Sequence, residues 1–294
     1  MGMRRLGLWY NGGMKTVMFS LAVFLGGMSA FGSVHVPLAV RPGNNMHLAD
    51  GTVEGVPCRL LVDTGATHTT FDLGFVTNRL PKVELQDVQL LGTTNVRTPP
   101  RFFPYKAFKL GEHAFASEGA MAIPLDMLAP SVGERVDGIL GMSDLSSGDF
   151  ILRDDELIFE PTDAERRGFG PDVRKGGDMT RPCVAGRHEG REIPFLVDSG
   201  SSFTFVKEGF WKPSTNAVSL SATEVSGRTG IRPRVGEQGV LDLGIPLILA
   251  PMISNHEPNY LGADLLKRYD ILFLSSGRAI AFRPRLWASA LTNY

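Results

Sequence analysis

The chain has 294 residues, of which 43% are hydrophobic and 21% charged, so it is long enough to bury the core of one large or two moderate domains. Its formal net charge of −1 leaves no basic surplus for phosphate contacts, which argues against nucleic-acid binding. The 34 glycines and 19 prolines are spread among short apolar runs, a composition that favours an all-β chain with many turns.

The amino terminus has the pattern of an export signal. Basic residues precede an uncharged stretch over residues 16–34, and small residues suited to a cleavage site lie just before Ser33. We predict a signal peptide over residues 1–32. An uncleaved signal-anchor is the main alternative because the stretch is just long enough to span a bilayer, and a buried element is a third. The sequence contains no Asn-x-Ser/Thr sequon, which favours a bacterial protein that is periplasmic, secreted or anchored in the inner membrane.

The segment after the predicted signal has the pattern of strands that lead to an aspartate in a tight turn. Apolar runs indicate strands over 34–40 and 46–62, with turns near Gly51 and Gly55. The second run ends in Asp63-Thr64-Gly65, where an aspartate meets a turn-forming glycine.

Three further features complete the first half. An apolar-turn-apolar pattern over 88–97 predicts a hairpin, and an apolar-apolar-Gly segment over 137–141 is followed by a short helix near 144–145. Residues 161–182 are polar and rich in glycine and proline, as expected of a linker. The predicted segments are a signal over 1–32, a first lobe over 33–160, a linker over 161–182 and a second lobe over 183–294.

The second half repeats the first. The apolar run 195–197 delivers Asp198 into Asp198-Ser199-Gly200, 135 residues after Asp63. Upstream of the aspartate, residues 186–192 match residues 51–57 at the same offset of 135 residues. A true internal repeat should keep one offset beyond the motif itself, and this one does. Downstream, 225–231 predicts a second hairpin, and a second apolar-apolar-Gly segment over 259–262 precedes a short helix over 263–268. The repeat indicates a pseudo-twofold enzyme with its active site between the halves.

The paired aspartates have an immediate chemical meaning. Two carboxylates held face to face cannot both ionise, so they share a proton, and one becomes a general base while the other is a general acid. A lone aspartate beside glycine is more often a turn former or a cap, but the duplicated motif favours catalysis by Asp63 and Asp198. This chemistry requires neither a metal nor another cofactor, and the sequence contains no metal-ligand cluster.

These motifs resemble those of the aspartic proteases, over residues from about 34 to about 283. Val62-Asp63-Thr64-Gly65-Ala66 is similar to the retroviral type and Asp198-Ser199-Gly200-Ser201 to the pepsin type. The resemblance implies an all-β, bilobal fold with two pseudo-twofold-related, β-barrel-like lobes. It also implies that Ile139-Leu140-Gly141 and Tyr260-Leu261-Gly262 support the two catalytic loops from beneath.

The resemblance further implies an aspartic endopeptidase that acts on a protein or peptide substrate. Thr64 and Ser199 are then expected to exchange hydroxyl hydrogen bonds with the backbone of the opposite loop. Because one chain carries both turns, we expect a monomer. The remaining residues expected to support the catalytic loops are Gly65, Thr67, Gly200, Ser201 and Ser202. The hairpin predicted over 88–97 stands where the family has the flap that covers the substrate, and 225–231 stands at the corresponding place in the second half. The expected flap residues are Gly92, Thr93 and Thr94.

One position departs from the pepsin pattern. The third residue after each aspartate is a hydroxyl donor in pepsin-type lobes, and Ser201 keeps the hydroxyl whereas Ala66 does not. A hydroxyl donated to a carboxylate favours its ionised form. We therefore expect the pair to be harder to ionise than a dyad with both donors, with an activity optimum from mildly acidic towards neutral pH.

Two questions stay open at this point. Cys58 and Cys183, the only cysteines, fall at different points of the repeat, and they are either one disulfide or two small buried hydrophobic residues. The alternative to an enzyme is a non-catalytic peptide-binding or inhibitory relative that retains the scaffold.

Overall fold

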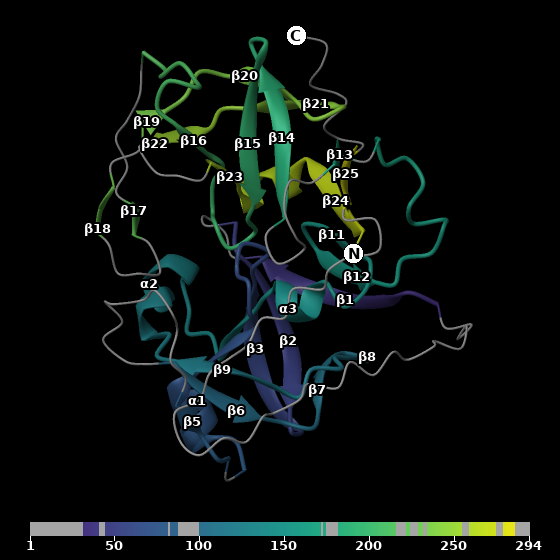
Figure 1. Cartoon of the computed structure of the whole chain (residues 1–294), viewed down its shortest axis with the longest axis vertical. Helices are drawn as coiled ribbons and strands as arrows, with labels where there is room; N and C mark the ends of the chain where they lie inside the picture. The colour runs from purple at the N-terminus through teal and green to yellow at the C-terminus, as the bar shows by residue number, and fades with distance from the viewer. Residues whose placement is uncertain are drawn as a thin grey trace, which may run out of the picture. The chain divides into compact units, whose positions relative to one another are not determined.

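The computed structural model describes residues 32–40, 45–81, 83–87, 100–171, 173–174, 182–215, 222–223, 229–231, 234–254, 259–274 and 279–285 (Figure 1). The chain from residue 32 onward forms one compact unit. Apart from Gly32, the predicted signal peptide or anchor lies outside the described residues. Within the described ranges, no helix is long and apolar enough to cross a membrane.

Most described elements are strands of two sheets. Fifteen of the described strands form one sheet: β1 (Val34–Val40), β2 (His47–Val53), β3 (Val56–Val62), β4 (Thr70–Asp72), β5 (Gln86–Asp87), β6 (Arg101–Pro104), β7 (Phe108–Leu110), β8 (His113–Ala114), β9 (Gly119–Ile123), β10 (Gly138–Leu140), β11 (Phe150–Leu152), β12 (Glu156–Phe159), β13 (Val173–Arg174), β24 (Tyr269–Leu274) and β25 (Ala279–Pro284). Eight more form the second sheet: β14 (Cys183–His188), β15 (Arg191–Val197), β16 (Phe205–Lys207), β19 (Arg234–Val235), β20 (Gly239–Asp242), β21 (Pro246–Leu249), β22 (Met252–Ser254) and β23 (Asn259–Leu261). A separate pair consists of β17 (Ala222–Thr223) and β18 (Thr229–Ile231).

The described helices are short. They are α1 (Leu73–Asn78), the 3-10 helix η1 (Asp126–Leu128), α2 (Ala129–Val132), α3 (Met142–Leu145) and the 3-10 helix η2 (Ala263–Lys267). The helices predicted near 144–145 and over 263–268 are confirmed as α3 and η2. Both begin directly after the glycine of an apolar-apolar-Gly segment, Gly141 in the first half and Gly262 in the second.

The sequence repeat is also a repeat of strand pairing. In the first half β3 pairs in parallel with β10, β10 antiparallel with β4, β4 in parallel with β9, and β9 antiparallel with β6. The second half follows the same order and directions with β15, β23, β16, β22 and β19. The expected all-β fold with two pseudo-twofold-related lobes is confirmed.

A matching hairpin leads to the aspartate in each half. The turns between β2 and β3 and between β14 and β15 both consist of a Glu-Gly pair, Glu54-Gly55 and Glu189-Gly190. All four residues have positive φ, from 46° to 77°, as in the type I′ turns that suit two-residue hairpins. The predicted turn near Gly55 is confirmed. The one near Gly51 is wrong, because Gly51 lies inside β2, where a Cβ would approach atoms of the β7 strand to 2.6 Å.

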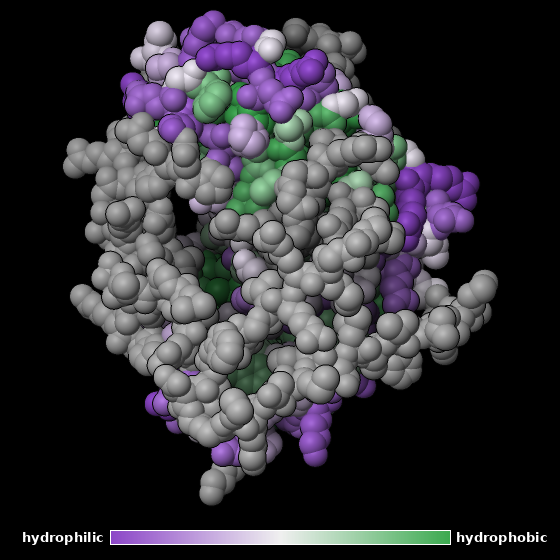
Figure 2. Space-filling view, viewed as in Figure 1, coloured by the Kyte–Doolittle hydropathy of each residue, from purple (hydrophilic) through white to green (hydrophobic). Residues whose placement is uncertain are grey.

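The strands that carry the aspartates are fully buried at the end that reaches them. The last three residues of β3 and the last three of β15 are buried, whereas the first two of β15 are exposed. Figure 2 shows hydrophilic side chains over the turn end of the β14–β15 hairpin and apolar side chains nearer its other end. Each hairpin is therefore anchored in the core beside its aspartate.

Strands from both ends of the chain join the halves. β24 pairs with β25 on one side and with β11 of the first half on the other, and β11 continues to β12 and β1 (Figure 1). Alternate residues face opposite sides, so that Phe150 and Phe273 stack in the main core at 4.4 Å between ring centroids while Ile151 and Leu272 lie in a small cluster on the other face. Phe169, from the segment predicted as a linker, packs against this cluster. The joining strands are thus covered on both faces.

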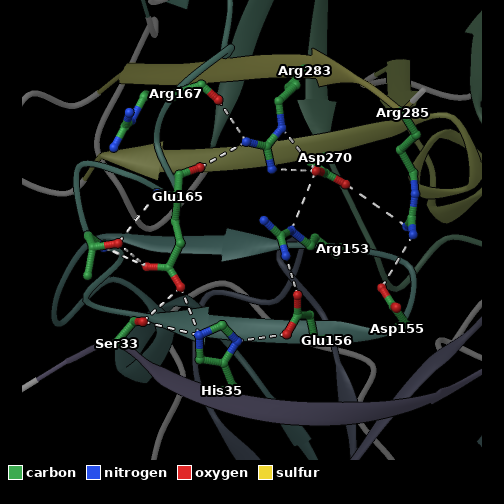
Figure 3. A network of polar contacts seen from close by, with 11 residues as sticks. Ser33, His35, Arg153, Asp155, Glu156, Glu165, Arg167, Asp270, Arg283 and Arg285 are labelled. Atoms are coloured by element: carbon green, nitrogen blue, oxygen red, sulfur yellow. Dashed lines mark hydrogen bonds and ion pairs between the residues drawn. The ribbon is translucent and has the colours of Figure 1, made fainter. Parts of the chain in front are cut away.

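A polar network lies along the same strands (Figure 3). Asp270 of β24 is only 7% exposed, and its carboxylate lies 2.6 Å from Arg283, 3.4 Å from Arg153 and 4.0 Å from Arg285. Arg153 lies between β11 and β12 of the first half, whereas Arg283 lies in β25 and Arg285 directly follows it. The buried charge of Asp270 is therefore balanced by residues of both halves.

Cys58 is a free thiol, so the disulfide considered from the sequence is not formed. It is 4% exposed on β3, and burial raises the pKa of its thiol to about 12. The alternative prediction, two small buried hydrophobic residues, is confirmed for Cys58 but is wrong for Cys183, which is half-buried.

Replacing Asp270 with alanine is expected to destabilise the protein by roughly 2–3 kcal/mol, because it removes a carboxylate shared by three half-buried arginines and the only described carboxylate partner of Arg283. Asp155→Ala is the matched control, since Asp155 is 72% exposed and meets Arg285 at 3.4 Å. The control should lose less than about 1 kcal/mol. Urea denaturation of both variants measures the difference, and equal losses would contradict the role assigned to Asp270.

Candidate active site

The two aspartate turns face each other. Asp63 follows β3, Asp198 follows β15, and each is followed two residues later by a glycine. A Cβ added to Gly65 would lie 2.4 Å from the carboxyl carbon of Asp198, and one added to Gly200 would lie 2.3 Å from that of Asp63. Any side chain at either glycine would displace the opposite carboxyl group. The structure therefore brings together the two aspartates that the sequence pairs.

Thr64 and Ser199 bind the two turns to each other. The Thr64 N–H donates to Ser199 Oγ at 3.0 Å, and the Ser199 N–H donates to Thr64 Oγ1 at 3.0 Å. The Thr64 hydroxyl donates to the carbonyl of Val197 at 2.8 Å, and the Ser199 hydroxyl donates to that of Val62 at 2.7 Å. The exchange of hydroxyl hydrogen bonds implied by the resemblance is confirmed. Because Thr64 and Ser199 are 0% and 4% exposed, water cannot replace these bonds.

The apolar-apolar-Gly segments support the turns as expected. The Asp63 N–H donates to the carbonyl of Leu140 at 3.0 Å, and the Asp198 N–H donates to that of Leu261 at 2.9 Å. Gly141 and Gly262 have no room for a side chain, because a Cβ would lie 2.6 Å and 2.3 Å from the backbone that follows the two turns.

Two threonines that bind the apolar-apolar-Gly segments were not identified from the sequence. Thr69 Oγ1 accepts the Gly141 N–H at 3.1 Å, and Thr204 Oγ1 accepts the Gly262 N–H at 3.1 Å. Thr69 and Thr204 stand at the same 135-residue offset as the aspartates. Extending the repeat comparison by two positions beyond Thr67 and Ser202 would have found them.

The two carboxyl groups have different surroundings. Oδ1 of Asp63 accepts the N–H groups of Gly65 at 2.8 Å and Ala66 at 3.0 Å, while Oδ1 of Asp198 accepts the Gly200 N–H at 3.0 Å. Burial raises the pKa of both aspartates. The pKa of Asp198 lies well above its usual range, because burial is reinforced by the negative charge of Asp63. The structure thus favours one proton shared by the two aspartates.

The hydroxyl of Ser201 does not serve the dyad. It donates to the carbonyl of Phe203 at 2.8 Å, so its one hydrogen is directed away from Asp198. The expectation that Ser201 keeps a donor which Ala66 lacks is therefore wrong for this structure. The methyl group of Ala66 packs against an apolar cluster that includes Leu61 and Ile139. The backbone N–H groups of Ala66 and Ser201 favour the ionised forms of Asp63 and Asp198, respectively, so neither aspartate depends on a hydroxyl at this position.

The last residues of the loops contribute their carbonyl groups. The carbonyl of Thr67 accepts the Ser143 N–H at 3.0 Å, and the carbonyl of Ser202 accepts the side-chain amide of Asn45 at 2.9 Å. Asn45 was not identified from the sequence, where nothing marks a polar residue in the turn before β2 as a partner of the second half.

The expected flap residues Gly92, Thr93 and Thr94 lie outside the described residues. The strands that flank their segment, β5 and β6, pair antiparallel, with Gln86 opposite Phe102 and Asp87 opposite Arg101. In the second half β17 and β18 also pair antiparallel. The predicted hairpin over 225–231 shares only residues 229–231 with this pair, and its other residues lie outside the described residues. Neither hairpin's part in covering substrate is tested by these contacts.

The acidic residues beside the apolar-apolar-Gly segments bind neighbouring side chains and backbone. Asp264 accepts the Thr204 hydroxyl at 2.9 Å, and burial raises its pKa to about 6. Asp137 accepts the Arg59 N–H at 3.0 Å and meets Arg79 at 2.9 Å. Across the described ranges no three His, Cys, Asp or Glu side chains are grouped to hold a metal ion.

The architecture is that of the aspartic proteinases. The chain is similar to a crystal structure of aspartic proteinase from Irpex lacteus, with a TM-score of 0.53 and 11% sequence identity, over 89% of this chain and 100% of that one. Residues 49–143, which include Asp63 and Gly141, match the family model described as aspartyl protease. No curated protein sequence matches the chain. The resemblance to the aspartic proteases is confirmed, and the family and fold support a protease-type function.

Replacing Thr64 with valine should destabilise the protein by roughly 2–4 kcal/mol, because two buried backbone groups lose their partner. Thr64→Ser retains the hydroxyl and should cost less than about 1 kcal/mol. Urea denaturation of both variants measures the difference. Equal stability of the two would show that the hydroxyl bonds do not hold the halves together.

The raised pKa of Asp198 has a consequence for stability. A carboxyl whose folded pKa lies above its unfolded value stabilises the fold below the unfolded pKa, and this contribution is lost as the pH rises through the folded pKa. Asp198→Asn, which stays neutral, should therefore gain stability relative to the wild type as the pH rises from acidic to neutral. Denaturation midpoints across this range test the sign, and a difference that does not change with pH would contradict it.

Proposed function

We propose that the protein is an aspartic endopeptidase that hydrolyses peptide bonds with a water molecule activated between Asp63 and Asp198. The observation that carries this proposal is the reciprocal approach of each glycine to the opposite carboxyl group, at 2.4 Å and 2.3 Å for a Cβ atom added at Gly65 and Gly200. Such an approach requires both turns at once, and it holds the two carboxyl groups beside one another.

The surroundings of the carboxyl groups suggest the role of each. Asp63 is the general base, because the N–H groups of Gly65 and Ala66 stabilise its ionised form. Asp198 is the general acid, because burial and the charge of Asp63 favour its protonated form.

The reaction then has two steps. In the first, water forms a bond to the carbonyl carbon, its proton passes to Asp63, and the proton of Asp198 passes to the carbonyl oxygen. In the second, the C–N bond breaks, the proton on Asp63 passes to the leaving nitrogen, and a hydroxyl proton of the diol returns to Asp198. Both aspartates then have their starting protonation states. Because water attacks the carbonyl carbon directly, no covalent intermediate with the enzyme is formed.

The substrate is proposed to be an extended protein or peptide segment that binds between the halves as an added strand. Backbone hydrogen bonds would supply affinity and side-chain pockets selectivity. Since one chain carries both turns, the active species is proposed to be a monomer. Residues 1–32 are proposed to direct export to a bacterial periplasm, to the medium, or to the inner membrane as an anchor.

Asp63→Asn and Asp198→Asn should each abolish the cleavage of unfolded casein between acidic and neutral pH, because the mechanism needs one ionised and one protonated carboxyl group. Asp126→Asn is the control, since the Asp126 side chain is 79% exposed. It should cleave at the wild-type rate, and a chelator should have no effect on the wild type.

Circular dichroism would confirm that each variant is folded. An inactive wild-type protein would favour the non-catalytic relative. Substantial cleavage by either folded dyad variant, or inhibition by the chelator, would exclude the proposed mechanism.

A further inference from the structure

The side chain of Asn45 crosses from the first half to the catalytic loop of the second. Its Nδ2 donates to the carbonyl of Ser202 at 2.9 Å. Ser202 lies four residues after Asp198 on the same loop. The bond connects the turn before β2, which begins the first hairpin, to the loop that carries the proposed general acid.

This contact breaks the twofold symmetry of the loops. In the first half, the equivalent carbonyl, that of Thr67, accepts the N–H of Ser143 from its own half at 3.0 Å. In the second half the residue equivalent to Ser143 is Asp264, whose own backbone N–H interacts with its carboxyl group. The carbonyl of Ser202 is therefore held from the opposite half, where that of Thr67 is held locally.

Asn45 is fixed in the position that this bond requires. It is 6% exposed, and the next two residues, Met46 and His47, are 6% and 0% exposed. Its φ of 57° places it in the left-handed region, which asparagine adopts more readily than most residues with a side chain. A buried amide with a defined backbone conformation has little freedom to leave its acceptor.

We propose that Asn45 is a positioning residue that holds the Asp198 loop against the first half and thereby sets the distance between the two carboxyl groups. The proposal rests on the proposed function for its effect on cleavage. Its effect on the carboxyl groups is independent of cleavage. The interaction between Asp63 and Asp198 weakens with distance, so loosening the loop brings the two apparent pKa values of the pair closer together.

The test uses Asn45→Gly, which accommodates the positive φ and removes the side chain together with its amide. The matched control is Glu189→Gly, which makes the same change at an exposed hairpin turn with a φ of 46°. The pair is titrated by NMR of isotope-labelled aspartate carboxyl carbons, with Asp63→Asn and Asp198→Asn to assign the signals. Cleavage of casein-derived peptides is measured over the same pH range.

In Asn45→Gly we expect the upper apparent pKa of the pair to fall and the lower one to rise, with a narrower pH profile. We also expect kcat to fall roughly tenfold with KM within about twofold, because the reacting groups are displaced more than the substrate site. Glu189→Gly should match the wild type in both measurements. Pair pKa values unchanged from the wild type in folded Asn45→Gly would overturn the proposal.

Two further outcomes are decisive. If the wild type does not cleave, the proposed function is wrong, and the titration alone decides whether Asn45 sets the pairing. If Asn45→Gly does not fold, Asn45→Asp replaces it, because a protonated carboxyl donates to the carbonyl of Ser202 whereas an ionised one does not. The stability lost by Asn45→Asp should then shrink as the pH falls, and a loss independent of pH would overturn the proposal.

Discussion

The structure depends on the four hydrogen bonds that Thr64 and Ser199 make across the two halves. Each of the two hydroxyl groups donates to one backbone carbonyl and accepts one backbone N–H, so none of these buried groups is satisfied unless both turns meet. Separating the halves would expose or orphan all of them, and an orphaned buried group typically costs about 1–3 kcal/mol. The meeting of the turns is therefore a condition of folding, and the facing of the carboxyl groups follows from it.

A symmetric backbone here supports an asymmetric pair of acids. β3 and β15 deliver their aspartates with the same pairing, and Leu140 and Leu261 accept the aspartate N–H groups in the same way. The differences include the amide of Asn45, which binds only the second loop, and the charge of Asp63, which raises the pKa of Asp198. Small differences are sufficient to make the two acids unequal, because the position of one proton shared by two adjacent carboxyl groups depends on any difference between their surroundings.

What the sequence predicted well was local or repeated. The Glu-Gly turns, the Asp-(Thr/Ser)-Gly turns and the glycines before α3 and η2 each depend on a few adjacent residues, and their recurrence in both halves supported the prediction. The misplaced turn at Gly51 and the role of Asn45 depend on residues distant in the chain, Lys109 and Ser202, and the direction of the Ser201 hydroxyl depends on how its loop folds. No pattern within one segment encodes such contacts. The pairing of β24 with β11 is of the same kind, since it joins strands more than a hundred residues apart.

Two buried acidic sites in the same molecule show why the dyad keeps a proton. Around Asp270, arginines from both halves supply positive charge to balance the carboxylate. The described partners of Asp63 and Asp198 are backbone N–H groups and each other. Amide dipoles stabilise one negative charge, but they do not offset the repulsion of two, and the second charge is removed by a proton. An arginine placed as it is beside Asp270 would favour loss of that proton, and with it the general acid that the proposed reaction requires.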